Sequence, residues 1–176
     1  MDAAVENFRP SMPSTLQDMD AHITRALLRA NVSRLLEIGG ANFDRAAMMA
    51  QRDGRYVCVR RHDPDAFPEV PDNSVMLWED PDWWCGGDID FLDAALVTNT
   101  RQIRRFEQLL EVIWNQLQPG AMLIVAEACA ACPQEPAASD SLRTAAQLHT
   151  SLTYAGFMVI SMEDALDGVV FGARRT

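Results

Sequence analysis

Short apolar runs alternate along this chain with stretches in which apolar residues recur at helical spacing. Seven runs are typical of strands: 35–38, 56–59, 74–78, 92–97, 121–126, 157–161 and 169–173. Helical patterns cover about 15–31, 100–117 and 141–154, and another begins at about Asn42 or Asp44. This alternation predicts an α/β fold, a doubly wound and mostly parallel sheet of seven strands with helices on both faces.

The sequence predicts two parts. Residues 1–31 form an N-terminal arm, in which Pro10 and Pro13 oppose regular structure, followed by an amphipathic helix. Residues 32–176 hold all seven strands and form one domain. The nearly all-apolar run at 121–126 predicts a central strand, and Pro119-Gly120 predicts the end of the helix before it.

The chain is acidic, with a formal net charge of −10, and all 15 basic residues are arginines. An acidic chain repels phosphate backbones, so we expect no nucleic-acid binding. No run reaches the ~20 apolar residues of a membrane helix, and the N-terminus lacks the features of a secretory signal, so we expect a cytoplasmic protein with no membrane contact.

Four cysteines and three histidines give no pattern typical of a metal site. Cys129 and Cys132 form a single CxxC pair, whereas a structural zinc usually needs two such pairs or added histidines. We therefore expect no metal, and the role of the pair stays open.

An apolar run, a glycine pair and the start of a helix follow one another between Val32 and Ala50. This order predicts a buried strand, a tight turn at Gly39-Gly40 and a helix N-terminus. In open α/β sheets, ligands bind at this end of the strands. The sequence therefore places a candidate site there.

Several segments resemble class I S-adenosylmethionine-dependent methyltransferases, over about 32–175. The similar segments are LLEIGG, LLEVIWNQLQPGAMLIVAE, LTYAGFMVIS and VVFGARR, in the family's order and spacing. The resemblance implies a Rossmann-like sheet whose last strand is antiparallel to the rest. It also implies that S-adenosylmethionine, if bound at all, meets Glu37, Gly39, Gly40, Ala41, Asp63 and Asp80.

Two departures from the family's pattern predict a degenerate cofactor site. Ala41 and Phe43 stand where the family has its later glycines, and Phe43 would place a ring where the methionine moiety lies. Arg61, or Arg60 with a shift of one residue, stands at the acidic position that binds the ribose hydroxyls. Arginine has no acceptor and cannot take that role.

The loop 79–87, EDPDWWCGG, carries two adjacent tryptophans at the expected ligand edge. Trp83 and Trp84 offer a platform for a substrate, or they plug the cleft or contact a partner. With Phe43 and Arg61 they form our set of partner-binding or cleft-plugging residues. Glu127, after the fifth strand, is a candidate base, and no catalytic residue is assigned.

Two hypotheses about function remain. In the first, the protein is a non-catalytic, methyltransferase-like pseudoenzyme that binds a protein partner or forms a homo-oligomer, and it takes no cofactor. In the second, it is a divergent S-adenosylmethionine-dependent methyltransferase that acts on a small molecule or a protein. The loss of two cofactor contacts favours the first.

Overall fold

The computed structural model describes residues 14–61, 69–87, 89, 92–128, 143–165 and 168–176, with side chains from residue 19 on. Seven strands form one sheet in the order β3-β2-β1-β4-β5-β7-β6. Strands β1 to β5 pair in parallel, and β7 runs antiparallel to both β5 and β6. The predicted α/β fold and its antiparallel last strand are confirmed.

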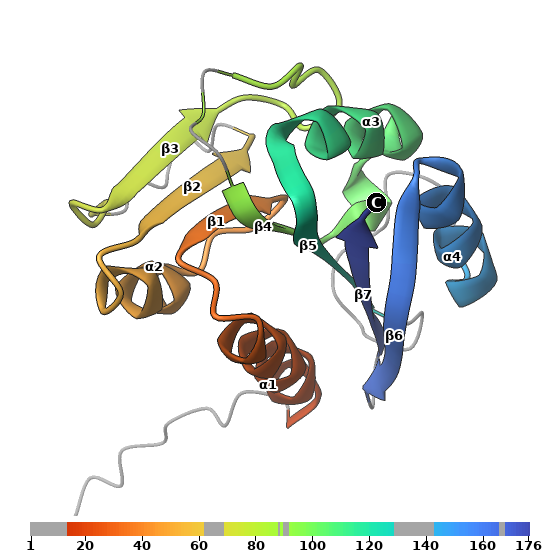
Figure 1. Ribbon diagram of the computed structural model, residues 1–176, viewed down its shortest axis with the longest axis horizontal. Helices are drawn as coiled ribbons and strands as arrows, with labels where there is room; N and C mark the ends of the chain where they lie inside the picture. Colours follow the sequence, from red (N-terminus) through yellow and green to blue (C-terminus); the bar gives the residue numbers. More distant parts are fainter. Residues whose placement is uncertain (1–13, 62–68, 88, 90–91, 129–142, 166–167) are drawn as a thin grey trace, which may run out of the picture.

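Four helices and one short 3-10 helix connect the strands (Figure 1). In chain order the elements are α1 (Ser14–Arg29), β1 (Arg34–Ile38), α2 (Phe43–Ala50), β2 (Arg55–Arg60), β3 (Ser74–Trp78), β4 (Leu92–Val97), η1 (Thr100–Gln102), α3 (Phe106–Gln116), β5 (Leu117–Ala128), α4 (Ala145–Tyr154), β6 (Phe157–Ala165) and β7 (Gly168–Arg175).

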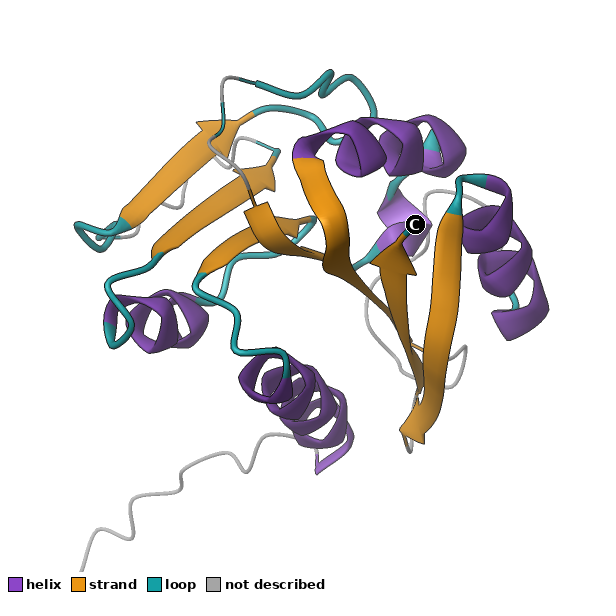
Figure 2. Ribbon diagram, in the orientation of Figure 1, coloured by secondary structure: helices purple, strands orange, loops and turns teal. Residues whose placement is uncertain are grey.

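The helices divide between the two faces of the sheet, and each face has its own core (Figure 2). Ile23 and Leu27 of α1 join Ala46 and Met49 of α2 in one buried apolar cluster. Helices α3 and α4 supply the other, which includes Phe106 and Leu148. Strands β1, β4 and β5 are covered on both sides, which explains why apolar residues predominate in them.

Strand β5 is central, as predicted, and Leu123, Ile124 and Val125 have no exposed surface. Its start was predicted too late. The strand begins at Leu117, which is extended and pairs with Leu92, so Pro119 and Gly120 lie inside the strand. The pairing shifts between Leu92 and Ala94, and the positive φ of +80° at Gly120 bends the chain there.

Other boundaries also differ from the sequence prediction. The pattern over 100–117 forms two elements, η1 and α3, because Asn99 is left-handed and Ile103 is extended. Helix α4 begins at Ala145, where Thr144 and Gln147 form a capping box. Strand β6 extends to Ala165 and strand β7 begins at Gly168, because the two strands pair with each other.

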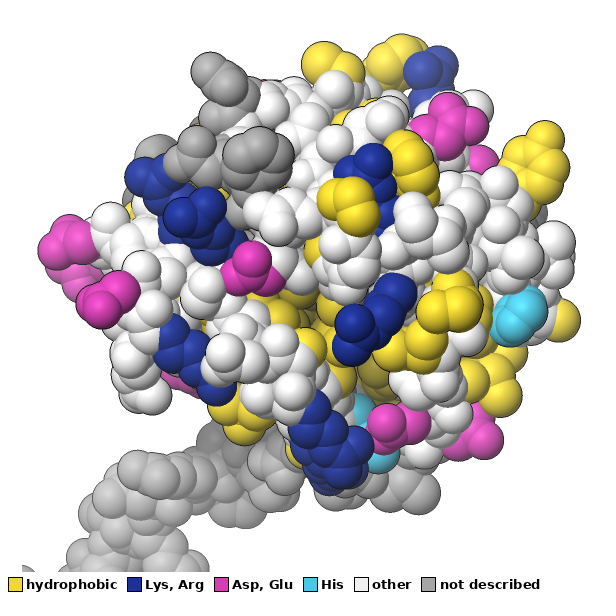
Figure 3. Space-filling view, viewed as in Figure 1, with side chains coloured by type: hydrophobic (Ala, Val, Ile, Leu, Met, Phe, Trp, Pro, Cys, Tyr) yellow, Lys and Arg dark blue, Asp and Glu magenta, His cyan; other side chains and the backbone are white. Residues whose placement is uncertain are grey.

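Acidic, basic and apolar side chains are interspersed on the face shown in Figure 3. No helix in the described part of the chain is long and apolar enough to cross a bilayer. Helix α1 is fixed to the far edge of the sheet, where His22 Nδ1 lies 2.5 Å from Glu163 Oε2 of β6. The predicted N-terminal helix thus packs on the same sheet as the rest of the chain.

Candidate functional site

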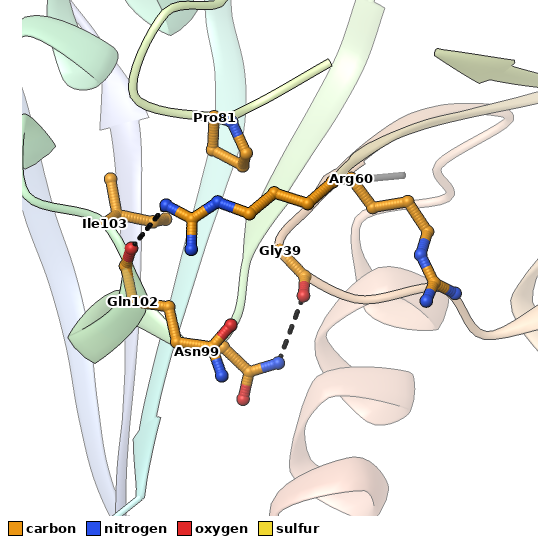
Figure 4. Close-up of a pocket in the computed structure, with 7 residues that line it drawn as sticks. Gly39, Arg60, Pro81, Asn99, Gln102 and Ile103 are labelled. Carbon is orange, nitrogen blue, oxygen red and sulfur yellow. Dashed lines mark hydrogen bonds between the residues drawn. The ribbon is translucent and has the colours of Figure 1, made fainter. Parts of the chain in front are cut away.

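A small pocket lies at the carboxyl ends of the parallel strands, where neighbouring strands β1 and β4 connect to opposite faces of the sheet (Figure 4). Its lining residues are Gly39, Arg60, Arg61, Pro81, Asn99, Gln102 and Ile103. The pocket has a volume of about 100 Å³. Sites for drug-sized ligands typically measure roughly 300–1,000 Å³, so only a fragment of such a ligand fits between the described residues.

Gly39 is required by the close approach of β4. Its φ is +92°, and a Cβ atom there would lie 2.2 Å from the carbonyl oxygen of Thr98. Its N–H donates to Val59 O at 3.1 Å, and its carbonyl accepts from Asn99 Nδ2 at 3.1 Å. Both polar groups of this backbone unit are therefore used within the protein, as Figure 4 shows for Asn99.

The rest of the glycine turn also packs inward. A Cβ atom on Gly40 would lie 2.8 Å from Thr98 Oγ1, and Cys58 Sγ donates to Gly40 O. Ala41 packs against the apolar cluster beneath α1 and α2. Asn42 caps α2 with its side chain and donates its N–H to the Tyr56 hydroxyl at 3.0 Å. These contacts fix the turn against β2.

Glu37 is buried, and side chains are its hydrogen-bond partners. It accepts from Arg45 Nη1 at 2.6 Å and from the Tyr56 hydroxyl at 2.8 Å. Arg45 also pairs with Asp20 of α1. Burial raises the pKa of Glu37 against the opposing effect of Arg45, and it raises the pKa of Tyr56 as well. The cluster joins α1, β1, α2 and β2 beneath the turn.

Phe43 does not line the pocket. It begins α2, and its ring makes an edge contact with Tyr56, with centroids 6.4 Å apart. It is half-buried beside the cluster under α1 and α2. We expected the ring where the methionine moiety of a cofactor would lie, but its contacts in the structure are those of a packing residue.

Arg61 crosses the pocket from the end of β2. Its Nε lies 3.0 Å from Asp80 Oδ1, and its Nη2 lies 3.2 Å from Asp82 Oδ2 and 3.0 Å from Gln102 O. Asp80, which we expected near a cofactor, is therefore paired with Arg61. The Arg60 guanidinium lies instead over the ring of Trp78, 5.7 Å from its centroid. Asp63 lies outside the described residues, as do Cys129 and Cys132.

The two tryptophans of the loop have opposite environments. Trp84 is 3% exposed and belongs to the core beneath α3, so it is not available to a partner. Trp83 is 68% exposed, and Arg105 lies over its ring at 3.7 Å. Pro81, in the same loop, forms part of the pocket wall.

Glu127 lies at the end of β5, 4% exposed, and accepts from Arg101 Nε at 3.0 Å. Burial raises its pKa, whereas Arg101 and Arg143 lower it. Among the described residues, its second oxygen has no hydrogen-bond partner, and neither has the buried Thr100 hydroxyl. Glu127 is not among the residues that line the pocket described above, and its candidate role as a base stays a prediction.

Three residues of the site were missed by sequence reasoning. Asp82 and Asn99 bind Arg61 and Gly39, and Arg45 neutralises Glu37. Arg45 lies eight residues after Glu37, on the first turn of the helix that follows the glycine pair. A charged residue on the inward face of that helix was the available signal. Asp82 had none, because its partners come from β2 and α3.

Comparison with known proteins gives matches in structure only. No family model matches the sequence, and no curated protein matches it either. The [4+2]-cyclase SpnF superposes with a TM-score of 0.67 at 15% identity, over 89% of this chain and 81% of that one. The N-methyltransferase NodS from Bradyrhizobium japonicum WM9 gives 0.62 at 15% identity, over 89% and 96%.

The glycopeptide N-methyltransferase MtfA, solved with S-adenosyl-L-homocysteine, gives a TM-score of 0.65 at 12% identity, over 91% of this chain and 90% of that one. Identities this low establish the fold alone, and the cyclase shows that the fold is not confined to methyl transfer. The chain therefore has the Rossmann-like α/β fold that these solved methyltransferases and the cyclase share.

Proposed function

We propose that this protein is a non-catalytic binding protein built on the methyltransferase fold, one that does not take S-adenosylmethionine in the usual way and acts through a protein partner. The observation that carries the proposal is Arg61, whose guanidinium spans the pocket between Asp80, Asp82 and the carbonyl of Gln102. A ligand that entered between β2 and η1 would have to displace this side chain.

The chemistry of Arg61 supports the same conclusion. The family resemblance requires an acceptor for two ribose hydroxyls at this place, and a guanidinium offers only donors. The guanidinium is paired instead with Asp80 and Asp82 of the loop after β3.

The glycine turn supports the proposal independently. Three of its backbone N–H groups, on Gly39, Asn42 and Asp44, donate to Val59 O, Tyr56 Oη and Asn42 Oδ1. An anionic group at a helix N-terminus needs free N–H donors. A turn that uses these donors internally keeps its shape without a ligand.

The second candidate is a divergent methyltransferase that acts on a small molecule or a protein. The solved structures NodS and MtfA, which share the fold, favour it, and so does an open pocket at the position where α/β sheets bind ligands. A methyltransferase of this kind would have to bind the cofactor with Arg61 withdrawn.

Calorimetric titration with S-adenosylmethionine and S-adenosylhomocysteine separates the two candidates. We expect no saturable binding at concentrations below about 100 µM, against the roughly micromolar binding of an intact site. Saturable binding in that range would overturn the proposal and establish the divergent enzyme. The Arg61→Ala variant tests the cause, because it empties the space between β2 and η1 while Gly39 and Glu37 stay in place.

Arg104→Ala is the matched control for this titration. Arg104 is exposed and has no ion pair or hydrogen bond among the described contacts. If Arg61 blocks the site, Arg61→Ala gains affinity for S-adenosylhomocysteine and Arg104→Ala does not. A partner or a second copy is detected separately, by the molar mass of the purified protein in solution.

A further inference from the structure

The segment 79–87 after β3 is anchored on its inner side. Pro81 and Trp84 are buried, and the N–H groups of Trp83 and Trp84 donate to Asp80 O at 2.9 and 3.0 Å. Asp82 Oδ1 accepts from the N–H of Arg105 at 2.9 Å, which fixes the loop to the start of α3. The segment is therefore anchored on both sides of an exposed residue.

That residue is Trp83, which is 68% exposed in a loop whose next residue is core. Arg105 covers one face of its indole ring at 3.7 Å and restricts its motion. A large aromatic side chain that is already ordered loses little conformational entropy on binding, and such tryptophans are frequent binding hot spots. The geometry is that of an anchor for a partner.

The charge beside Trp83 specifies the partner. Arg104 and Arg105 are both exposed, and neither guanidinium has an acidic partner among the described residues. Glu107, the next acid along the chain, accepts instead from the Ser151 hydroxyl. In a chain of net charge −10, these are two exposed guanidinium groups that no described carboxylate neutralises.

We infer that Trp83, Arg104 and Arg105 form a docking site for an acidic segment of another protein, one that places an apolar side chain on the indole and carboxylates on the two guanidinium groups. The inference rests on the proposed binding function and names its surface. A symmetric dimer through this patch is disfavoured, because a two-fold axis there would bring like charges together.

The test uses two fluorescein-labelled decapeptides, one that alternates glutamate with leucine and one that alternates lysine with leucine. We expect saturable binding of the glutamate peptide by fluorescence anisotropy, weakened by added salt, and none of the lysine peptide. Trp83→Ala and the double change Arg104→Glu with Arg105→Glu should each weaken binding at least about tenfold. Circular dichroism checks that each variant is folded.

Tyr154→Ala and Arg25→Glu are the matched controls, because both residues are exposed and lie on other helices. They should leave the affinity unchanged. Equal binding of both peptides, no saturable binding of the glutamate peptide, or full affinity in Trp83→Ala would overturn the inference. A wild-type dimer that Trp83→Ala dissociates would also overturn it, since the occupant would then be a second copy. The S-adenosylmethionine titration is independent of these results, so each proposal can fail alone.

Discussion

The guanidinium of Arg61 lies 3.2 Å from the carboxylate of Asp82, and this contact ties the end of β2 to the loop that follows β3. The two residues differ in burial, since the Arg61 side chain is 46% exposed and the Asp82 side chain 8%. Asp82 also accepts from the backbone of Arg105 at the start of α3. Substitution of Arg61 and substitution of Asp82 should therefore destabilise the protein by different amounts.

We predict that Arg61→Ala lowers the free energy of unfolding by at most about 1 kcal/mol, because its ion pairs are exposed to solvent. Asp82→Ala should cost more, roughly 1–3 kcal/mol, because it also leaves the N–H of Arg105, the residue before α3, unpaired. Urea denaturation measures both, with Arg104→Ala as a neutral control. A larger loss for Arg61→Ala than for Asp82→Ala would contradict this account.

Glu37→Ala should be severely destabilising, by about 3–5 kcal/mol, because it leaves the buried Arg45 with one carboxylate partner, Asp20, instead of two. For a domain of this size, that loss lowers the melting temperature by roughly 6–20 °C, at about 2–4 °C for each kcal/mol. Asp44→Ala serves as the control, because Asp44 is an exposed residue next to Arg45 in α2. A melting temperature unchanged by Glu37→Ala would show that the buried pair contributes nothing to stability.

The adjacent tryptophans predict opposite outcomes for the same substitution. Trp84→Ala removes a core side chain and should cost about 3–5 kcal/mol. Trp83→Ala removes an exposed ring and should change the free energy of unfolding by less than about 0.5 kcal/mol. Thermal denaturation of the two variants side by side decides this, and similar losses in both would mean that Trp83 is also a packing residue.

Cys58 should resist alkylation while Cys85 reacts. Cys58 is fully buried, and burial raises the pKa of its thiol to about 12, whereas Cys85 is exposed. Iodoacetamide at pH 8, followed by peptide mapping, should label Cys85 in the native protein and Cys58 only after denaturation. Labelling of Cys58 at the rate of Cys85 would contradict the buried position of β2.

The same thiol predicts a loss of stability in alkali. Above pH 9.0, the unfolded chain releases the Cys58 proton while the folded chain keeps it up to a pKa of about 12. The folded state then binds more protons, so the free energy of unfolding falls as pH rises, by up to about 1.4 kcal/mol per pH unit for this group. Cys58→Ala should reduce the slope between pH 9 and pH 10, measured by urea denaturation at each pH. An unchanged slope would assign the alkaline loss to other groups.

The sequence was sufficient for the fold because the sheet's central strands are covered on both sides. The run at 121–126 is apolar throughout and the run at 92–97 is apolar except for Asp93, a composition typical of buried strands. Element ends were less predictable. The full length of β6 depends on its pairing with β7, and residues such as Glu163 and Asp164 give no local sign of it.

The candidate site was predictable in position but not in contacts. The glycine pair located the turn, and the arginine after β2 marked a departure from the family pattern. Which groups an arginine meets is decided by chain segments distant in sequence, as Asp82 and Gln102 show for Arg61. Likewise, no local sequence feature indicates that Trp83 is exposed and Trp84 buried, because the side chains of an irregular loop do not alternate with a fixed period.

The contact of Gly39 with Thr98 has a consequence for how glycine signatures are interpreted. Any side chain at position 39 would collide with the backbone of the adjoining strand, whatever the chain binds. Selection for folding alone would then preserve the glycine in descendants that had abandoned the ancestral chemistry. The glycine itself therefore says little about the present ligand. The informative positions are those in this turn whose backbone has free space around it.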